Sequence, residues 1–183
     1  MNNKYSKLLT IPLSNIDIMK SLGKSCRIIE YSELEEYSNI EDLLSKPKDY
    51  VIILIETVEQ NIGHWICLLR YQNTIEFFNS YGKPIDSQKN TLISPEKNKE
   101  FGQTRNYLSN LLYNSNYKIV YNKKQLQSFD NLSETCGRWV INRIECHMDR
   151  NLSLQQYIKY LEYLKAYCKI KSFDLLICEL VPI

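Results

Sequence analysis

The sequence predicts an α+β fold, with strands in the middle of the chain and helices before and after them. Residues 51–55 form a continuous apolar run, which suits a buried strand, and strand-like patterns follow at residues 63–70 and 74–80. From Cys136 onwards, apolar side chains recur at the three- and four-residue spacing that is typical of helices.

Length and composition indicate one globular domain. The chain has 183 residues, of which 44% are hydrophobic and 24% charged, with only 5 Gly and 5 Pro. These values exclude collagen-like, low-complexity and broadly disordered proteins, so we expect a single domain over residues 1–183. The longest apolar run is far shorter than the roughly 20 residues that cross a bilayer, and no secretory segment follows Met1. We therefore expect a soluble, intracellular protein that is not secreted.

The first third of the chain is expected to be mostly helical. Ser14 and Asp17 form a capping-box pattern ahead of apolar positions, so a helix should begin directly after Ser14. Ser32 and Glu35 have the same spacing and predict a second helical stretch that ends near Leu44.

Three strands are expected next, over residues 49–56, 63–70 and 74–80. The second and third are joined by about three residues centred on Gln72, so they should pair as a hairpin within a central antiparallel unit. Residues 83–99 are polar and are expected to form a surface loop.

The second half should begin with a helix over residues 99–113, followed by a strand over residues 117–121 and a polar loop over residues 122–135. A helix is expected beyond Cys136 and another from Leu154, within a helical tail whose role the sequence leaves open.

The charge is too balanced to indicate nucleic-acid binding by bulk electrostatics. The chain carries 23 basic and 21 acidic residues, a net charge of +2. A polyanion contact would need a local patch, for which Lys123, Lys124 or the lysine-rich residues 83–99 are candidates. Solvated loop charges are the simpler interpretation of these lysines.

Of the two histidines, His64 has a candidate partner. The hairpin register places His64 opposite residues 79–81, which brings Asn79 within cross-strand reach. An amide oxygen that accepts from the imidazole fixes its tautomer and orientation, as a catalytic base requires. The alternative is that Asn79, in the segment Asn-Ser-Tyr-Gly, only starts a turn.

Cys136 is the candidate nucleophile among six cysteines. No C-x-x-C pair occurs, so neither a zinc knuckle nor a redox dithiol is indicated, and most cysteines should be buried small hydrophobes. Cys136 differs because it lies where a polar loop becomes a helix, and a helix start favours thiolate over thiol. A nearby His64 would add an ion pair, and Gly137 would let a substrate backbone approach. An inert cysteine at a helix start is the alternative.

Acyl transfer also needs hydrogen-bond donors for the developing oxyanion. The backbone N–H of Cys136 is one candidate, and the side chain of Gln127 or, less favoured, Gln125 is another. Spacing does not decide between the two glutamines, and either could instead face solvent.

Four ordered motifs resemble those of the adenovirus-type maturation cysteine proteases, in the adenain and ubiquitin-like-protease superfamily. The similarity is to the versions of virophages, Polinton-like elements and large DNA viruses in particular, and it extends over about residues 12–145. The motifs are GHW at residues 63–65, FFNSYG at residues 77–82, LQ at residues 126–127 and TCGR at residues 135–138, after a PLSN opening at residues 12–15.

The resemblance implies a papain-like or adenain-like fold, with a central, mixed, mostly antiparallel sheet flanked by helices. It also implies that Cys136 is the nucleophile and that His64 is its general base and later acid. Asn79 would orient the imidazole, and Gln127 would donate to the oxyanion. We expect no metal site and make no claim for a cofactor.

According to the same resemblance, Trp65 would line the substrate site. Gly137 is the second candidate for a substrate contact, because it has no side chain to block a substrate backbone. The sequence departs from the family pattern at two of the proposed catalytic residues, Asn79 and Gln127. Asn79 stands where many relatives have Asp, and an amide orients a neutral imidazole but does not offset an imidazolium charge. Gln127 lies nine positions before Cys136, a longer gap than in the adenoviral or SUMO-protease forms.

The function implied by the resemblance is a cysteine endopeptidase that cleaves capsid and core precursor proteins near glycine-containing sites during particle maturation. Its location would be the virion, the host cytoplasm with its virus factory, or both, with no membrane partner. Some relatives use a small peptide or DNA as an activator. The alternatives are a ubiquitin or SUMO isopeptidase, an acetyltransferase, and an inactive binding module.

Overall fold

The computed structural model describes residues 7–45, 49–129 and 133–183. Its contacts divide the chain into two compact units, which are described separately. The sheet unit comprises Cys26–Asn79 and Lys83–Lys123, and the helical unit comprises Met1–Ser25, Ser80–Gly82 and Lys124–Ile183. A single domain over residues 1–183 stays a prediction.

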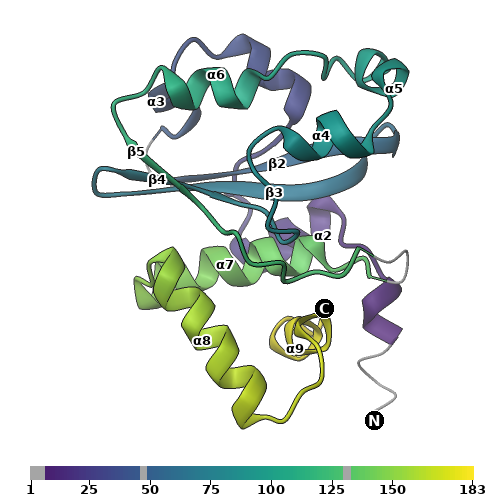
Figure 1. The fold of residues 1–183 in the computed structure, drawn as a ribbon, viewed down its shortest axis with the longest axis vertical. Coiled ribbons are helices and arrows are strands. Elements are labelled where there is room, and N and C mark those ends of the chain that lie inside the picture. Colours follow the sequence, from purple (N-terminus) through teal and green to yellow (C-terminus); the bar gives the residue numbers. More distant parts are fainter. Residues whose placement is uncertain (1–6, 46–48, 130–132) are drawn as a thin grey trace. The chain divides into compact units, whose positions relative to one another are not determined.

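The sheet unit contains a mixed, mostly antiparallel sheet, as predicted (Figure 1). Its strands follow one another in space in their chain order, with β2–β3 and β3–β4 antiparallel and the two edge pairs, β1–β2 and β4–β5, parallel. The strand β1 was not predicted, because three residues are too few to show an alternating pattern. The described strands are β1 (Ile28–Glu30), β2 (Tyr50–Glu59), β3 (Ile62–Tyr71), β4 (Thr74–Phe78) and β5 (Lys118–Tyr121).

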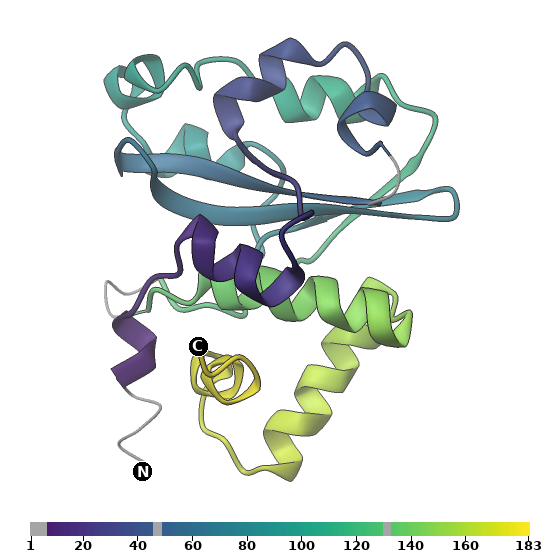
Figure 2. The same cartoon turned by 180° about the vertical axis from the view of Figure 1, so that it is seen from behind.

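Short helices cover one face of this sheet, and Figures 1 and 2 show them on the same side of the strands. The core between them includes Val51, Ile53 and Ile55 of β2 together with Leu34 and Leu108 from the helices. The α+β class is therefore confirmed. The described helices of this unit are η2 (Tyr31–Glu36), α3 (Ile40–Leu43), α4 (Ser87–Leu92), α5 (Pro95–Glu100) and α6 (Tyr107–Tyr113).

The helical stretch predicted from Ser32 to Leu44 is two short helices instead. The capping box of η2 is formed by Glu30 and Glu33, two residues earlier than the predicted pair. Asn39 then caps α3 by accepting from a backbone N–H, and a capping residue in the middle of the stretch ends one helix and starts another.

The surface loop predicted over residues 83–99 is wrong, because α4 and α5 occupy most of it. Ser94 accepts from the Lys97 N–H at the start of α5, and Pro95 occupies the first turn. The one long helix predicted over residues 99–113 is also wrong. Gly102 has a φ of 67°, a left-handed conformation that separates α5 from α6.

Lys89 of α4 is fully buried, contrary to the interpretation of this region as solvated charges. Its Nζ donates to Oδ1 of Asn90 at 2.9 Å and to Oδ1 of Asn106 at 3.0 Å, and it lies 5.4 Å from the ring centroid of Tyr31. Burial lowers the pKa of its ammonium group. Lys89 is therefore not available to a polyanion.

Gly63, the glycine of the GHW motif, is required by the sheet. It pairs with Glu56 of β2, and a Cβ atom at Gly63 would lie only 2.0 Å from the carbonyl oxygen of Ile55. A side chain here would collide with the β2 backbone, so glycine permits the close strand pairing that precedes His64.

The helical unit packs α7 against α2 and α9, and α8 against α9. The predicted capping box of Ser14 and Asp17 begins α2, and α7 and α8 begin where the sequence predicts. No helix of the described ranges combines the length and apolarity that crossing a membrane requires. The described helices of this unit are η1 (Lys7–Thr10), α2 (Asn15–Leu22), α7 (Cys136–Arg150), α8 (Leu154–Tyr167) and α9 (Phe173–Leu180).

Candidate functional site

His64 and Asn79 meet in the sheet unit. His64 lies near the start of β3, and Asn79 directly follows β4, in a register that places Cys67 opposite Phe78. The His64 Nε2 atom lies 3.0 Å from Asn79 Oδ1, and the two residues are 4% and 1% exposed. The predicted contact is present, while the catalytic roles of both residues stay predictions.

The His64 imidazole is neutral at physiological pH. Burial disfavours its charged form and lowers its pKa from 6.5 to about 4, and the hydrogen bond to Asn79 opposes this shift only in part. Because the amide oxygen of Asn79 only accepts, Nε2 carries the proton and Nδ1 carries the lone pair. The imidazole is thus in the form that a general base needs.

Asn79→Asp is expected to move the acid limb of the pH–rate profile, where activity falls as the pH is lowered, to higher pH. His64 works as a base only above its pKa, and a carboxylate in hydrogen-bond contact favours the imidazolium, which raises that pKa by about one unit or more. The wild-type limb should lie near the pKa of about 4, and the variant's limb above it. Cleavage rates over a pH series and NMR titration of the His64 ring measure the shift. An unchanged limb would contradict the assignment of His64 as the base.

Two further polar residues, which the sequence analysis missed, hold Asn79. Its Nδ2 donates to Gln88 Oε1 at 2.9 Å, which turns its Oδ1 towards His64. Its backbone N–H donates to Asn122 Oδ1 at 2.9 Å, and its carbonyl oxygen accepts from Asn122 Nδ2 at 2.6 Å. Both partners are almost fully buried. No spacing rule indicates them, because Gln88 lies in the region interpreted as a loop and Asn122 follows an edge strand.

Gln88→Leu is expected to lower kcat/KM about tenfold, because the Asn79 amide loses the acceptor that selects its orientation. Gln88→Glu keeps an acceptor and should retain more activity, and its added negative charge should raise the His64 pKa. Steady-state kinetics and the NMR tautomer signature of His64 measure both effects. Equal activity of wild type and Gln88→Leu would show that Gln88 does not position Asn79.

Trp65 is nearly buried, at 6% exposure, and directly follows His64 on β3. Successive side chains of a strand point to opposite faces of the sheet, so Trp65 and His64 lie on opposite faces. Its predicted role in contacting substrate is not tested by this geometry and stays a prediction.

Cys136 lies in the helical unit as the first residue of α7, which confirms the predicted helix start. It is 4% exposed, and Gly137 after it is also buried. Arg138, fully buried in the same turn, donates to the carbonyl oxygens of Ile11 at 2.6 Å and Ile183 at 2.5 Å. Burial lowers the pKa of Arg138, and its charge interactions with Cys178 and Cys136 oppose that shift. Cys136 therefore lies near a positive charge.

Gln127 is buried within the segment that leads to Cys136. Its Oε1 accepts from Ser80 Oγ at 2.7 Å, and its Nε2 donates to the Ser133 carbonyl oxygen at 2.7 Å. Gln125 donates through Nε2 to the Gln127 carbonyl oxygen at 2.9 Å. In this geometry the Gln127 amide is bonded to Ser80 and to the Ser133 backbone, so its oxyanion role, like that of the Cys136 N–H, stays a prediction.

The other cysteines are mostly packing residues, as predicted. The described residues contain no disulfide. All but Cys168 are buried, and burial raises the pKa of Cys178 to about 11.

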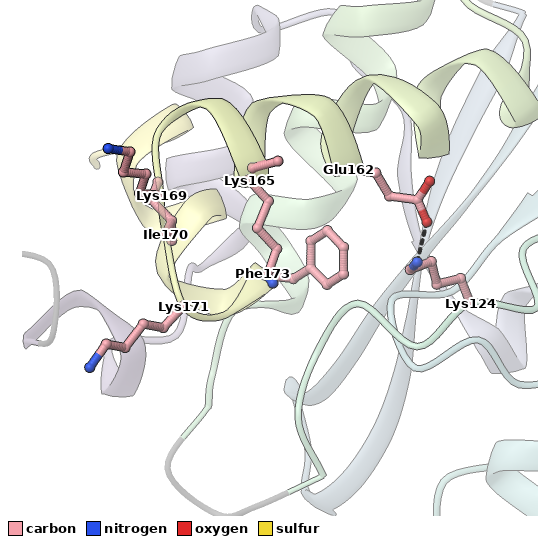
Figure 3. A pocket seen from close by; sticks show the side chains of 8 residues that line it. Lys124, Glu162, Lys165, Lys169, Ile170, Lys171 and Phe173 are labelled. Atoms are coloured by element: carbon pink, nitrogen blue, oxygen red, sulfur yellow. Dashed lines mark hydrogen bonds and ion pairs between the residues drawn. The ribbon is translucent and has the colours of Figure 1, made fainter.

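A lysine-rich pocket of about 490 Å³ lies between α8 and α9 of the helical unit (Figure 3). Lys124 forms an ion pair with Glu162 across it, and the Nζ atoms of Lys124 and Lys165 each lie 5.3 Å from the ring centroid of Phe173. Lys169 and Lys171 also line it. Whether Lys123, Lys124 or residues 83–99 contact a polyanion is not tested by this structure.

Three solved structures with some likeness to this chain are proteases. The pS273R protease of ASFV, in two structures, has TM-scores of 0.45 and 0.44 at 17% and 16% identity. The aligned part is 81% of this chain but only 62% and 61% of that protease, so the chain spans less than two thirds of its length. The SUMO protease Ulp1 has a TM-score of 0.42 at 13% identity, over 98% of this chain and 83% of Ulp1. Likenesses at these scores carry no argument about activity.

The chain has a relative in a virophage. No family model matches the chain. Protein V9 of the Sputnik virophage, described as an uncharacterized protein, is 35% identical over 167 residues, which are 90% of this chain and 91% of V9. A similarity of this level over nearly the full length of both proteins places this chain in the same family as protein V9 of the Sputnik virophage.

Proposed function

We propose that the chain is a cysteine endopeptidase of the adenain and ubiquitin-like-protease superfamily. The observation that supports this most is the buried hydrogen bond between His64 and Asn79, because a neutral imidazole held by an amide oxygen is the arrangement that a general base requires. The second support is Cys136 at the first residue of α7, near the charge of Arg138, where a thiolate is favoured.

In the proposed reaction, His64 takes the proton from the Cys136 thiol, and the thiolate attacks the carbonyl carbon of the peptide bond. The oxyanion accepts from the Cys136 backbone N–H and from the Gln127 side-chain amide, whose Nε2 gives up its hydrogen bond to the Ser133 carbonyl oxygen for this step. His64 then gives its proton to the leaving amine, and a thioester remains. Water attacks the thioester while His64 takes its proton, and that proton returns to the sulfur as the carboxylic acid product leaves.

The proposed substrates are capsid and core precursor proteins, cut near glycine-containing sites during maturation in the virion or in the virus factory of the host cytoplasm. Membership in a family that includes a virophage protein supports a viral setting. Trp65 and Gly137 are proposed to contact the substrate, and a peptide or DNA activator remains part of the proposal. All four motifs of the proposed site are present, which favours an active enzyme over a retained binding module.

The deciding experiment compares new protein termini, by mass spectrometry, in virus-producing cells that carry wild type or Cys136→Ala. We expect termini next to glycine in capsid or core proteins with wild type alone. Identical termini in both would reject the proposed function. Ubiquitin and SUMO activity probes test the isopeptidase alternative, because efficient labelling of Cys136 at low enzyme concentration would favour it over a capsid-restricted protease.

A further inference from the structure

Asp174 is a buried carboxylate near the start of α9, in the C-terminal tail of the helical unit. Its Oδ1 accepts from the hydroxyls of Ser133 at 2.7 Å and Thr135 at 2.6 Å. Its Oδ2 accepts from the Ser128 backbone N–H at 2.9 Å. One carboxylate on the last helix therefore binds residues from the segment that leads to Cys136.

The carboxylate itself is held firmly. Ser172 caps α9, and Asp174 lies in the first turn, where the helix dipole stabilises negative charge. Leu176, Ile177 and Cys178 of the same helix are at most 1% exposed, so α9 is anchored by its apolar face. A fixed carboxylate forms stronger hydrogen bonds than a neutral acceptor, because its bonds are assisted by charge.

Thr135 connects Asp174 to the start of α7, where Cys136 lies. It is the residue before α7, a position where a hydroxyl commonly caps the helix. Within the described residues, its hydroxyl makes no such cap and donates to Asp174 instead. The same carboxylate binds Ser133, whose carbonyl oxygen accepts from Gln127. Asp174 thus orients both the start of α7 and the segment of the proposed oxyanion donor.

We propose that Asp174 is a positioning residue for Cys136, so that the first turn of the C-terminal helix α9 holds the nucleophile's segment in place in addition to packing. This inference rests on the proposed cysteine chemistry, and it adds a role for a tail that the four motifs do not include. Asp174 acts through Thr135 and Ser133, whose hydroxyls direct the backbone that precedes the nucleophile.

The test uses Asp174→Asn, Thr135→Val and Thr135→Ser in the full chain. Glu179→Gln is the matched control, since it removes a charge from an exposed position of the same helix. We expect Asp174→Asn and Thr135→Val to lower kcat about 10- to 100-fold with KM within about twofold, because orientation and not binding is lost. Thr135→Ser and Glu179→Gln should remain near wild type.

A second measurement does not need a substrate. The rate of Cys136 alkylation by iodoacetamide, followed over a pH series, should change in Asp174→Asn and Thr135→Val and stay unchanged in Thr135→Ser. This separates the two proposals: wild type without peptidase activity would reject the proposed function, whereas the alkylation profiles still test Asp174. If Asp174→Asn unfolds, Thr135→Val decides. Wild-type kcat and alkylation in a folded Thr135→Val would overturn the inference.

Discussion

Cys136→Ala is expected to abolish peptide cleavage, with kcat/KM reduced about 10,000-fold or more, because no other atom replaces the attacking sulfur. The change removes only a sulfur atom from a residue at the start of α7, so the helix should persist. Cleavage of a glycine-containing capsid precursor measures activity, and circular dichroism measures folding. Cys168→Ala, at an exposed cysteine, is the matched control and should cleave like wild type. Cleavage by folded Cys136→Ala at the wild-type rate would remove Cys136 from the mechanism.

A double variant tests whether Cys136 and His64 act as a unit. When two residues act together in one catalytic step, substitution of either one removes nearly all the rate acceleration that the pair provides. Cys136→Ala with His64→Ala should therefore be about as inactive as Cys136→Ala alone. Losses that multiply across the two sites would mean that the two residues act independently.

His64→Ala is expected to lower kcat/KM about 100- to 10,000-fold, because proton transfer to and from the reacting groups is lost. The variant also removes the partner of Asn79 Oδ1, so a buried amide oxygen loses a hydrogen bond and the sheet unit should lose some stability. Cleavage assays below the variant's melting temperature separate the two effects. His147→Gln, at the other histidine, is the control that should keep activity. Equal losses in both histidine variants at a temperature where both are folded would point to a structural role for His64.

Local patterns predicted the elements that depend on neighbouring residues. The run at residues 51–55 is at most 4% exposed, as its apolar sequence indicates. The hairpin between β3 and β4 follows from a short turn, and a turn fixes the register that brings Asn79 to His64. The start of α7 at Cys136 follows from the change from polar loop to periodic apolar residues.

The errors have two physical causes, of which the first is that polar residues look the same in a sequence whether they are exposed or buried. Residues 83–99 have the composition of a loop, yet Lys89 and Gln88 are buried there, with partners at Asn106 and Asn79 on other elements of the fold. The helix predicted over residues 99–113 failed at Gly102, because a left-handed residue is visible only in the backbone.

The α+β class, the central antiparallel strands, the pairing of His64 with Asn79 and the start of a helix at Cys136 could be predicted from the sequence, because each depends on the periodicity or spacing of residues close together in the chain. The partners of Asn79 and the contact between Asp174 and the residues before Cys136 are set by the tertiary fold. The Asn79–Asn122 and Thr135–Asp174 contacts join residues 43 and 39 positions apart, and the Asn79–Gln88 contact, nine positions apart, joins a strand end to a helix that the sequence pattern did not predict. A buried polar group must find a hydrogen-bond partner, but the fold decides which one.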